Sequence, residues 1–146
     1  MRIADGLKFC ASADAAPAEP GAYILQINLA ETLSVTIRRR PAVTLKAGYY
    51  LYCGSANGPG GLRSRLARHM RRGKSEHWHI DQLTEHGSVL GAWIARKGRE
   101  CDLVAMLGAL PMPILGFGSS DCACCRSHLL YAGVAGIPEY GAFRTV

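Results

Sequence analysis

The chain has 146 residues, a formal net charge of +6, 49% hydrophobic residues and 19% charged residues. This length suits one compact domain, and this composition supplies enough apolar side chains for a core, which excludes a disordered chain. No segment is long and apolar enough to cross a membrane, and the N-terminus lacks the apolar stretch of a secretory signal. We therefore expect a cytoplasmic protein whose six cysteines are thiols or metal ligands rather than disulfides.

The first twenty residues differ in composition from the rest of the chain. Residues 11–20, "ASADAAPAEP", are small and interrupted by proline, which is typical of a tail or linker. We therefore expect segment 1–20 to be a tail or linker and residues 21–146 to form the domain.

Three strands are predicted at the start of this domain. Residues 22–29 are apolar, residues 33–39 alternate between apolar and polar side chains, and residues 48–54 are rich in aromatic side chains and bounded by glycines. Short connections between the three favour an antiparallel meander.

A helix is predicted next, over about 61–72. Leu62, Leu66 and Met70 recur at intervals of four and form its buried stripe. One edge of this stripe, at the border between core and solvent, carries Arg65, His69 and Arg72. Arg63, Arg68 and Arg71 are expected to point further outward.

Three more elements follow this helix. A helix over 76–86 is expected to begin after Ser75 as N-cap and to end at Gly87. Residues 88–95 are predicted as a buried strand, and about 99–109 as a third helix. The predicted fold class is α+β: a small three-stranded antiparallel sheet flanked by helices, with or without one added strand.

Glu100 lies in the first turn of this third helix, on the side that carries Leu103, Val104 and Leu107. A carboxylate gains there from the helix dipole, but facing the core it needs a partner or a metal ion to offset its desolvation. The alternative is a rim glutamate that bends outward to water.

Positive charge is concentrated in the first half of the domain. There is no acidic residue between Thr32 and Ser75, while ten of the seventeen lysines and arginines lie there. Such clustering is typical of a protein that binds a polyanion, most often nucleic acid, although a solvated basic face is an equal alternative. The residues expected to bind nucleic acid are Arg63, Arg68, Arg71, Arg72 and Lys74.

Two other motifs are weak evidence for a phosphate loop and for a metal site. The glycine-rich turn at 54–61 lacks the Gly-Lys-Ser/Thr of a phosphate loop, so it is interpreted as a tight connection from strand to helix. In a helix, His77 and His79 would diverge by about 200° and could not share an ion, which favours packing or hydrogen-bonding roles.

A cluster of zinc-type ligands occurs late in the chain, at Cys122, Cys124, Cys125 and His128. A zinc site at Cys122, Cys124 and His128 is one alternative, and buried thiols with a hydrogen-bonded histidine are the default.

Several short motifs occur in one order: "GAY" at 21–23, "YCG" at 52–54, Arg65 and His69 four residues apart, and Glu100. In this order they resemble the GIY-YIG endonuclease family, from Gly21 to about Tyr131. Longer phrases resemble one branch of small GIY-YIG domain proteins: "YLYCGSANGPGGLRSRLARH", "HWHID", "EC" and "GFGSSDCACCRSHL".

The resemblance implies a divalent-metal-dependent endonuclease that hydrolyses phosphodiester bonds in nucleic acid. We favour DNA as the substrate, with RNA as the alternative, and a structure-selective nuclease is one form of this interpretation. It assigns catalytic roles to Tyr23, Tyr52, Arg65, His69 and Glu100, with Glu100 as the ligand of one Mg²⁺ or Mn²⁺ ion. Positive charge from Arg65, His69 and the metal is expected to lower a tyrosine pKa from its usual value near 10, and Tyr23 is favoured as the residue that activates water. The alternative role for His69 is a hydrogen bond to a tyrosine hydroxyl or a phosphate.

The chain departs from the family pattern at three points. Ala22 and Cys53 replace the middle residues of the two motifs, and we expect both to point away from the tyrosines. The late asparagine common in these nucleases is missing, and Ser119, Ser120 or His128 could fill its place. The alternatives to a nuclease are a non-catalytic nucleic-acid-binding module of the same fold and a zinc-stabilised interaction domain.

Overall fold

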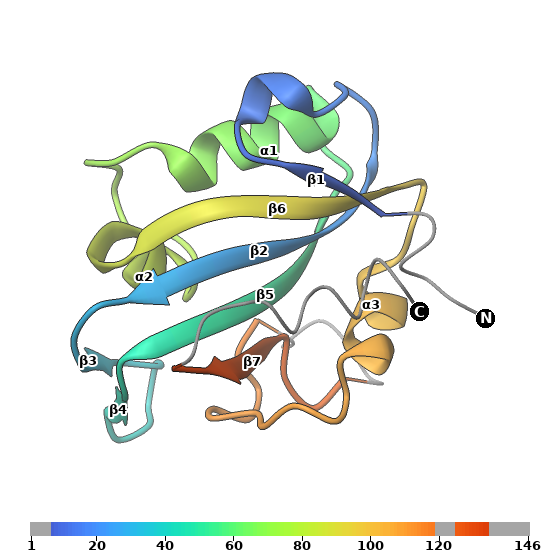
Figure 1. The fold of residues 1–146 in the computed structure, drawn as a ribbon. Coiled ribbons are helices and arrows are strands. Elements are labelled where there is room, and N and C mark those ends of the chain that lie inside the picture. Colours follow the sequence, from blue (N-terminus) through green and yellow to red (C-terminus); the bar gives the residue numbers. More distant parts are fainter. Residues whose placement is uncertain (1–6, 119–124, 135–146) are drawn as a thin grey trace.

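A computed structural model describes residues 7–118 and 125–134 of the chain (Figure 1). Its elements, in chain order, are β1 (Lys8–Cys10), the short 3₁₀ helix η2 (Ala13–Ala15), β2 (Gly21–Leu29), β3 (Leu33–Val35), β4 (Val43–Leu45), β5 (Gly48–Ala56), α1 (Gly61–Met70), α2 (Asp81–His86), β6 (Ser88–Arg96), α3 (Glu100–Met106) and β7 (Leu129–Gly133). The class is therefore α+β, as the sequence predicts. None of the helices in these two ranges is long and apolar enough to span a membrane.

The main sheet is antiparallel and has five strands in the order β1-β6-β2-β5-β7. The prediction of three strands, with or without one more, is therefore wrong in number. Its centre is β2, which pairs with β5 along its whole length, from Gly21 opposite Ala56 to Leu29 opposite Gly48. The two outer strands, β1 and β7, are short and were not predicted, because three to five residues carry too little alternation to be recognised.

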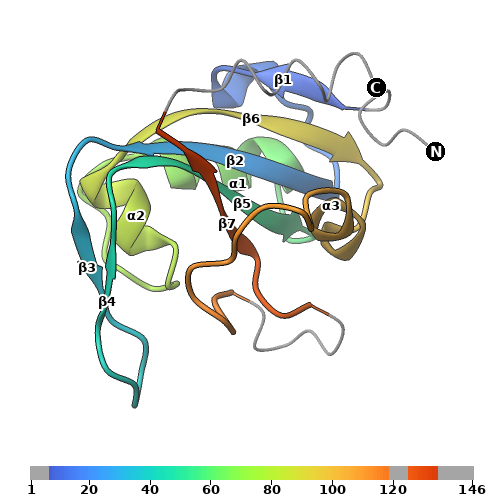
Figure 2. The ribbon, with the colours of Figure 1, turned by 60° about the horizontal axis from the view of Figure 1, so that its bottom comes forward.

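The predicted meander is also wrong at its second strand. Only Leu33–Val35 of the expected strand 33–39 is extended, and it pairs with β4 in a separate two-stranded sheet at one end of the molecule (Figure 2). The chain turns after it: the Arg40 N–H donates to the Ile37 carbonyl over 3.0 Å, and Arg39 has a φ of 63°. A left-handed residue ends a strand, so β2 pairs directly with β5 instead.

Helices cover both faces of the main sheet (Figure 2). Odd-numbered residues of β2 such as Tyr23 and Leu25 pack in one apolar cluster with Leu62 and Leu66 of α1 and with Leu83 of α2. The even-numbered residues Ala22 and Ile24 pack in a second cluster, on the opposite face, with α3. The period of two in a strand thus places the two tyrosines on the α1 face and sends their neighbours, Ala22 and Cys53, to the α3 face, as predicted.

The described part of segment 1–20 packs against the domain. β1 pairs with β6, and Cys10 and Ala16 are buried. The carbonyl of Glu19 accepts the Leu62 N–H over 2.8 Å, and the carbonyl of Pro17 accepts the Arg63 N–H over 3.0 Å. A segment predicted as a tail or linker therefore supplies an edge strand and satisfies the first turn of α1.

The helix predicted over 76–86 begins only at Asp81. Ser75 is not its N-cap, because the Asp81 carboxylate reaches backward and accepts the backbone N–H groups of His77 and Trp78 over 2.7 and 2.8 Å. These bonds hold residues 77–80 in a turn outside the helix. The predicted end of this helix at Gly87 is confirmed.

Candidate active site

A cavity of about 460 Å³ opens at one end of the sheet, on the α1 face. Its walls come from two central strands, one helix, the 77–79 turn and the start of α3. The lining residues are Tyr23, Tyr52, Gly54, Ser55, Arg65, His77, Trp78, His79, Glu100 and Gly118. Four of the five residues predicted as catalytic therefore line one cavity, and the fifth, His69, lies directly behind Tyr23.

A hydrogen bond 2.7 Å long joins the Tyr23 hydroxyl to Nε2 of His69, and both side chains are buried. Burial lowers the pKa of His69 from 6.5 to about 3, and the Asp81 carboxylate offsets this effect only in part because Arg65, Arg68 and Lys74 lower the pKa further. His69 is therefore neutral at physiological pH. The expectation that it supplies positive charge is wrong, and its alternative role, a hydrogen bond to a tyrosine hydroxyl, is the one the structure has.

Neither tyrosine has a lowered pKa. Burial raises the pKa of Tyr23, and the nearby Arg65 guanidinium offsets that effect only in part. Burial also raises the pKa of Tyr52, and the neighbouring Tyr23 and Glu100 raise it further. Both hydroxyls hold their protons at neutral pH in this structure.

Gly54 is the last residue of the second motif, and its place opposite Tyr23 explains why this position is a glycine. It lies opposite Tyr23 in the β2–β5 register, and a Cβ atom added to it would meet the Tyr23 ring, 2.6 Å from Cζ. Only glycine lets the Tyr23 ring lie flat over the neighbouring strand and reach the cavity.

Arg65 is held from two sides. One guanidinium nitrogen donates to the Ser55 carbonyl over 2.8 Å, and the guanidinium carbon lies 4.6 Å from the centre of the Trp78 ring. A guanidinium stacked on an aromatic ring is restrained in its plane. Arg65 also hydrogen-bonds the Tyr23 hydroxyl, and a guanidinium with five N–H donors has further donors for a ligand in the cavity.

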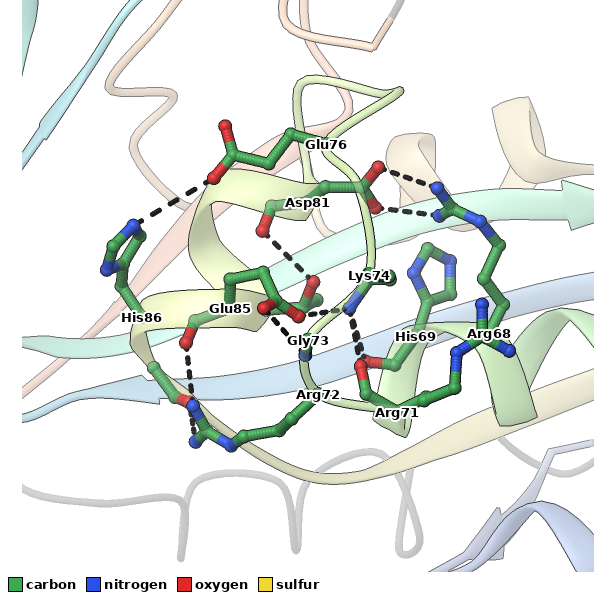
Figure 3. Close-up of polar contacts among 12 residues, drawn as sticks. Arg68, His69, Arg71, Arg72, Gly73, Lys74, Glu76, Asp81, Glu85 and His86 are labelled. Carbon is green, nitrogen blue, oxygen red and sulfur yellow. Dashed lines mark hydrogen bonds and ion pairs between the residues drawn. The ribbon is translucent and has the colours of Figure 1, made fainter.

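Asp81 organises the wall that carries Trp78. Its buried carboxylate forms two parallel bonds with Arg68, each 2.8 Å long, in addition to the two backbone bonds from the 77–78 turn (Figure 3). Against the cost of burial, these bonds hold the pKa of Asp81 at about 2. Arg68 also stacks on the Trp78 ring, 4.1 Å from its centre, so it does not point outward as predicted.

The other basic residues expected to bind nucleic acid are also largely engaged within the protein (Figure 3). Arg63 donates to the Ala16 carbonyl, Arg72 to the carbonyls of Glu85 and Gly87, and Lys74 to the Glu85 carboxylate. Arg71 is exposed, and its side chain has no hydrogen bond within residues 7–118 and 125–134. The basic face is therefore less available than the sequence suggests, because the acids that neutralise it come from α2.

Four residues of this wall were not among the predicted site residues: His77, Trp78 and His79, which line the cavity, and Asp81, which holds their turn in place. The divergence predicted for His77 and His79 of "HWHID" applies only in a helix, and both residues precede α2. Outside a helix both line the cavity. Asp81, four residues after His77, was the feature of the sequence that could have indicated this wall, because a buried carboxylate in a basic region needs an arginine partner.

Glu100 begins α3, and its partly exposed side chain reaches the cavity. Its Oε2 atom lies 3.6 Å from Nδ1 of the buried His128. No group of three or more potential metal-binding side chains exists within the described ranges. One carboxylate beside water is nevertheless a sufficient donor for a Mg²⁺ ion, which keeps most of its waters. Cys122 and Cys124 of the candidate zinc site lie outside the described residues.

The structure also bears on the phosphate-loop alternative. The first N–H groups of α1, from Gly61 to Ser64, all donate to backbone carbonyls. A helix N-terminus binds a phosphate through N–H groups that lack such partners, so this one does not offer a phosphate cradle.

The matching family model covers residues 22–139 and is described as "Domain of unknown function DUF123". The chain belongs to the DUF123 family. The match runs from the first motif, across every residue of the cavity, to beyond β7. Comparisons with curated proteins and with solved structures gave no match.

The buried His69 makes a prediction for stability. Because its pKa is about 3 when folded and 6.5 ordinarily, the unfolded chain binds more protons between these values. The free energy of unfolding should therefore fall as pH drops from about 6.5 toward 3, by on the order of 5 kcal/mol from this group. Denaturant titrations at pH 7, 6 and 5 measure this slope.

The control for this measurement uses two single substitutions. His69→Gln should reduce the slope between pH 7 and 5, whereas His86→Gln, at an exposed histidine, should leave it unchanged. Equal slopes in the wild type and His69→Gln would contradict a neutral, buried His69.

Proposed function

We propose that the protein is a divalent-metal-dependent endonuclease of the GIY-YIG type, hydrolysing phosphodiester bonds in nucleic acid, with DNA favoured over RNA. The observation that carries this proposal is that Tyr23, Tyr52, Arg65 and Glu100 line one cavity. These residues come from β2, β5, α1 and α3, and span 78 positions, from 23 to 100, of the sequence. The motif order in the sequence supports the same function.

Arg65 is the residue suited to the phosphate. Hydrolysis adds negative charge to the phosphoryl oxygens, and a fixed guanidinium stabilises that charge more in the transition state than in the ground state. The bond to Ser55 and the stack on Trp78 fix the guanidinium before substrate arrives, so little reorganisation is required.

Tyr23 and His69 are suited to position the attacking water, but not to remove its proton before it attacks phosphorus. When the Tyr23 hydroxyl donates its hydrogen bond to Nε2 of neutral His69, one lone pair of the tyrosine oxygen faces Arg65 and the other is left for a water in the cavity. The high pKa of Tyr23 means that proton transfer must accompany attack on phosphorus, not precede it. As the water proton passes to Tyr23, the Tyr23 proton can pass to His69.

Glu100 is the residue that would hold the divalent cation, and the bound cation would supply Lewis acidity toward the phosphate and the leaving oxygen. Its carboxylate is partly exposed at the cavity and is the acidic group among the lining residues. Tyr52 adds a protonated hydroxyl to the same wall, which can donate a hydrogen bond to a phosphate oxygen.

Cleavage assays test this proposal. We expect the protein to cut labelled single-stranded, duplex or branched DNA or RNA when Mg²⁺ or Mn²⁺ is present, and not when the cation is chelated. Glu100→Gln should lose this activity while it keeps the wild-type circular dichroism spectrum. No cleavage of any of these substrates, or full cleavage by Glu100→Gln, would overturn the proposal.

The second candidate is a non-catalytic nucleic-acid-binding module of the same fold. It is favoured by the raised pKa values of Tyr23 and Tyr52, since neither hydroxyl is primed as a base. Binding without cleavage in the same assays, weakened steeply by salt, would support this candidate instead.

A further inference from the structure

His128 is a buried histidine beside the cavity whose ring is poorly satisfied. It is 1% exposed, and neither ring nitrogen has a hydrogen-bond partner among the residues that the structure describes. Its backbone is fixed, since its N–H donates to the Phe117 carbonyl and its carbonyl accepts the Cys53 N–H, both over 2.9 Å. An unsatisfied buried nitrogen in a well-fixed position is costly, and it requires an explanation.

The nearest charged group to this ring is Glu100. Its Oε2 atom lies 3.6 Å from Nδ1 of His128. That separation is too long for a hydrogen bond. Two neighbouring donors about 2.1 Å from an octahedral ion lie roughly 3.0 Å apart, so the two side chains share one ion once they approach each other by about 0.6 Å.

We propose that Oε2 of Glu100 and Nδ1 of His128 together bind one divalent cation, and that the imidazole makes the site prefer Mn²⁺ to Mg²⁺. A carboxylate alone suits either ion, whereas imidazole nitrogen binds transition metals better than it binds Mg²⁺. Glu100 is partly exposed at the cavity, so the ion enters from that side and water completes its shell. A bound ion also gives one of the two unsatisfied nitrogens its partner.

The catalytic role of the ion rests on the proposed function, whereas its binding to Glu100 and His128 does not. This inference deepens the function by naming a second ligand and a metal preference. The competing arrangement is a direct ion pair, in which a protonated His128 faces Glu100 and no metal is bound by nitrogen. Metal binding and cleavage can therefore be measured separately.

The test uses Mn²⁺ as the probe, on the full chain without nucleic acid. Electron paramagnetic resonance of free Mn²⁺ counts the bound ions, and electron spin-echo modulation detects a ¹⁴N nucleus bonded to Mn²⁺. We expect one bound ion with a directly coordinated ¹⁴N, displaced by Mg²⁺ only when Mg²⁺ is in large excess. This measurement on the wild type needs no substitution, so it remains decisive if a His128 variant fails to fold.

Four variants assign the ligands. His128→Gln and Glu100→Gln should each weaken Mn²⁺ binding at least about tenfold, since even residues that only support a ligand have effects of this size. The ¹⁴N coupling should disappear in His128→Gln. His77→Gln and His79→Gln, at the histidines that line the cavity, should keep it.

Three results would overturn the inference: no bound Mn²⁺, bound Mn²⁺ without a coordinated ¹⁴N, or a coupling lost in His77→Gln or His79→Gln instead. If Mn²⁺ binds without nitrogen but nucleic acid is still cleaved, the ligand assignment fails and the proposed nuclease stands. If the ¹⁴N coupling is present but no nucleic acid is cleaved, the nuclease fails and the metal site stands.

Discussion

Arg65→Ala should lower kcat for phosphodiester cleavage by about 10²- to 10³-fold, the range found when one fixed donor to a transition-state oxyanion is removed. The reason is that the alanine variant loses the guanidinium that lines the cavity between Ser55 and Trp78. Single-turnover cleavage with saturating protein isolates this chemical step from binding. Circular dichroism and thermal unfolding establish that the variant is folded.

Two further arginine variants sharpen the test. Arg65→Lys keeps the charge but loses the planar fork and the stack, so most of the rate loss should remain. Arg71→Ala removes an exposed arginine that directly follows the same helix and does not line the cavity, and its effect should appear in KM and in the salt dependence of binding. If Arg65→Ala changed KM alone, Arg65 would be a binding residue and the role proposed for it in the transition state would be wrong.

Local periodicity was sufficient to predict how the candidate residues are distributed over the fold. The period of two in β2 and β5 places Tyr23 and Tyr52 on one face of the sheet, and Cys53 on the other. The helical spacing of four places His69 one turn after Arg65 on α1. These relations depend on backbone geometry alone, which is why a single sequence reveals them.

Pairing between distant segments could not be predicted in the same way. Strand Lys8–Cys10 is extended because it meets β6, some eighty residues later, and β7 because it meets β5. The strand expected at 33–39 has a good alternating pattern, but the turn at Arg39 takes it away from the sheet. A local pattern cannot specify which partner a strand finds.

Burial also changed the chemistry expected at the site. From the sequence, His69 is one turn from two arginines and looks like a source of charge. In the fold it is enclosed, and desolvation is the dominant effect on its pKa, followed by opposing contributions from Asp81 and the nearby cations. The Tyr23–His69 pair is therefore neutral, and this changes the proposed role of Tyr23 from an ionised base to a neutral hydroxyl that passes the water proton on to His69.

Asp81→Asn should lower the free energy of unfolding by about 3 kcal/mol or more, the cost of leaving one member of a buried ion pair without its partner. The carboxylate is fully buried and accepts four bonds: two from Arg68 and two from the backbone of the 77–78 turn. Because Trp78 stacks on Arg65, the same substitution should also disorder the wall that holds Arg65. Urea titrations monitored by tryptophan fluorescence measure the loss of stability.

The chain contains a matched control for this prediction. Arg96 and Glu19 form an ion pair of the same chemistry, but their side chains are 62% and 42% exposed, against 22% and 0% for Arg68 and Asp81. Glu19→Gln should therefore cost less than about 1 kcal/mol, because water screens an exposed pair. In a double-mutant cycle, Arg68→Met combined with Asp81→Asn should recover part of the loss, since no buried charge is then left unpaired. Equal losses for Asp81→Asn and Glu19→Gln would mean that burial does not strengthen the Arg68–Asp81 pair, and that the wall behind Arg65 is held by the Trp78 stack alone.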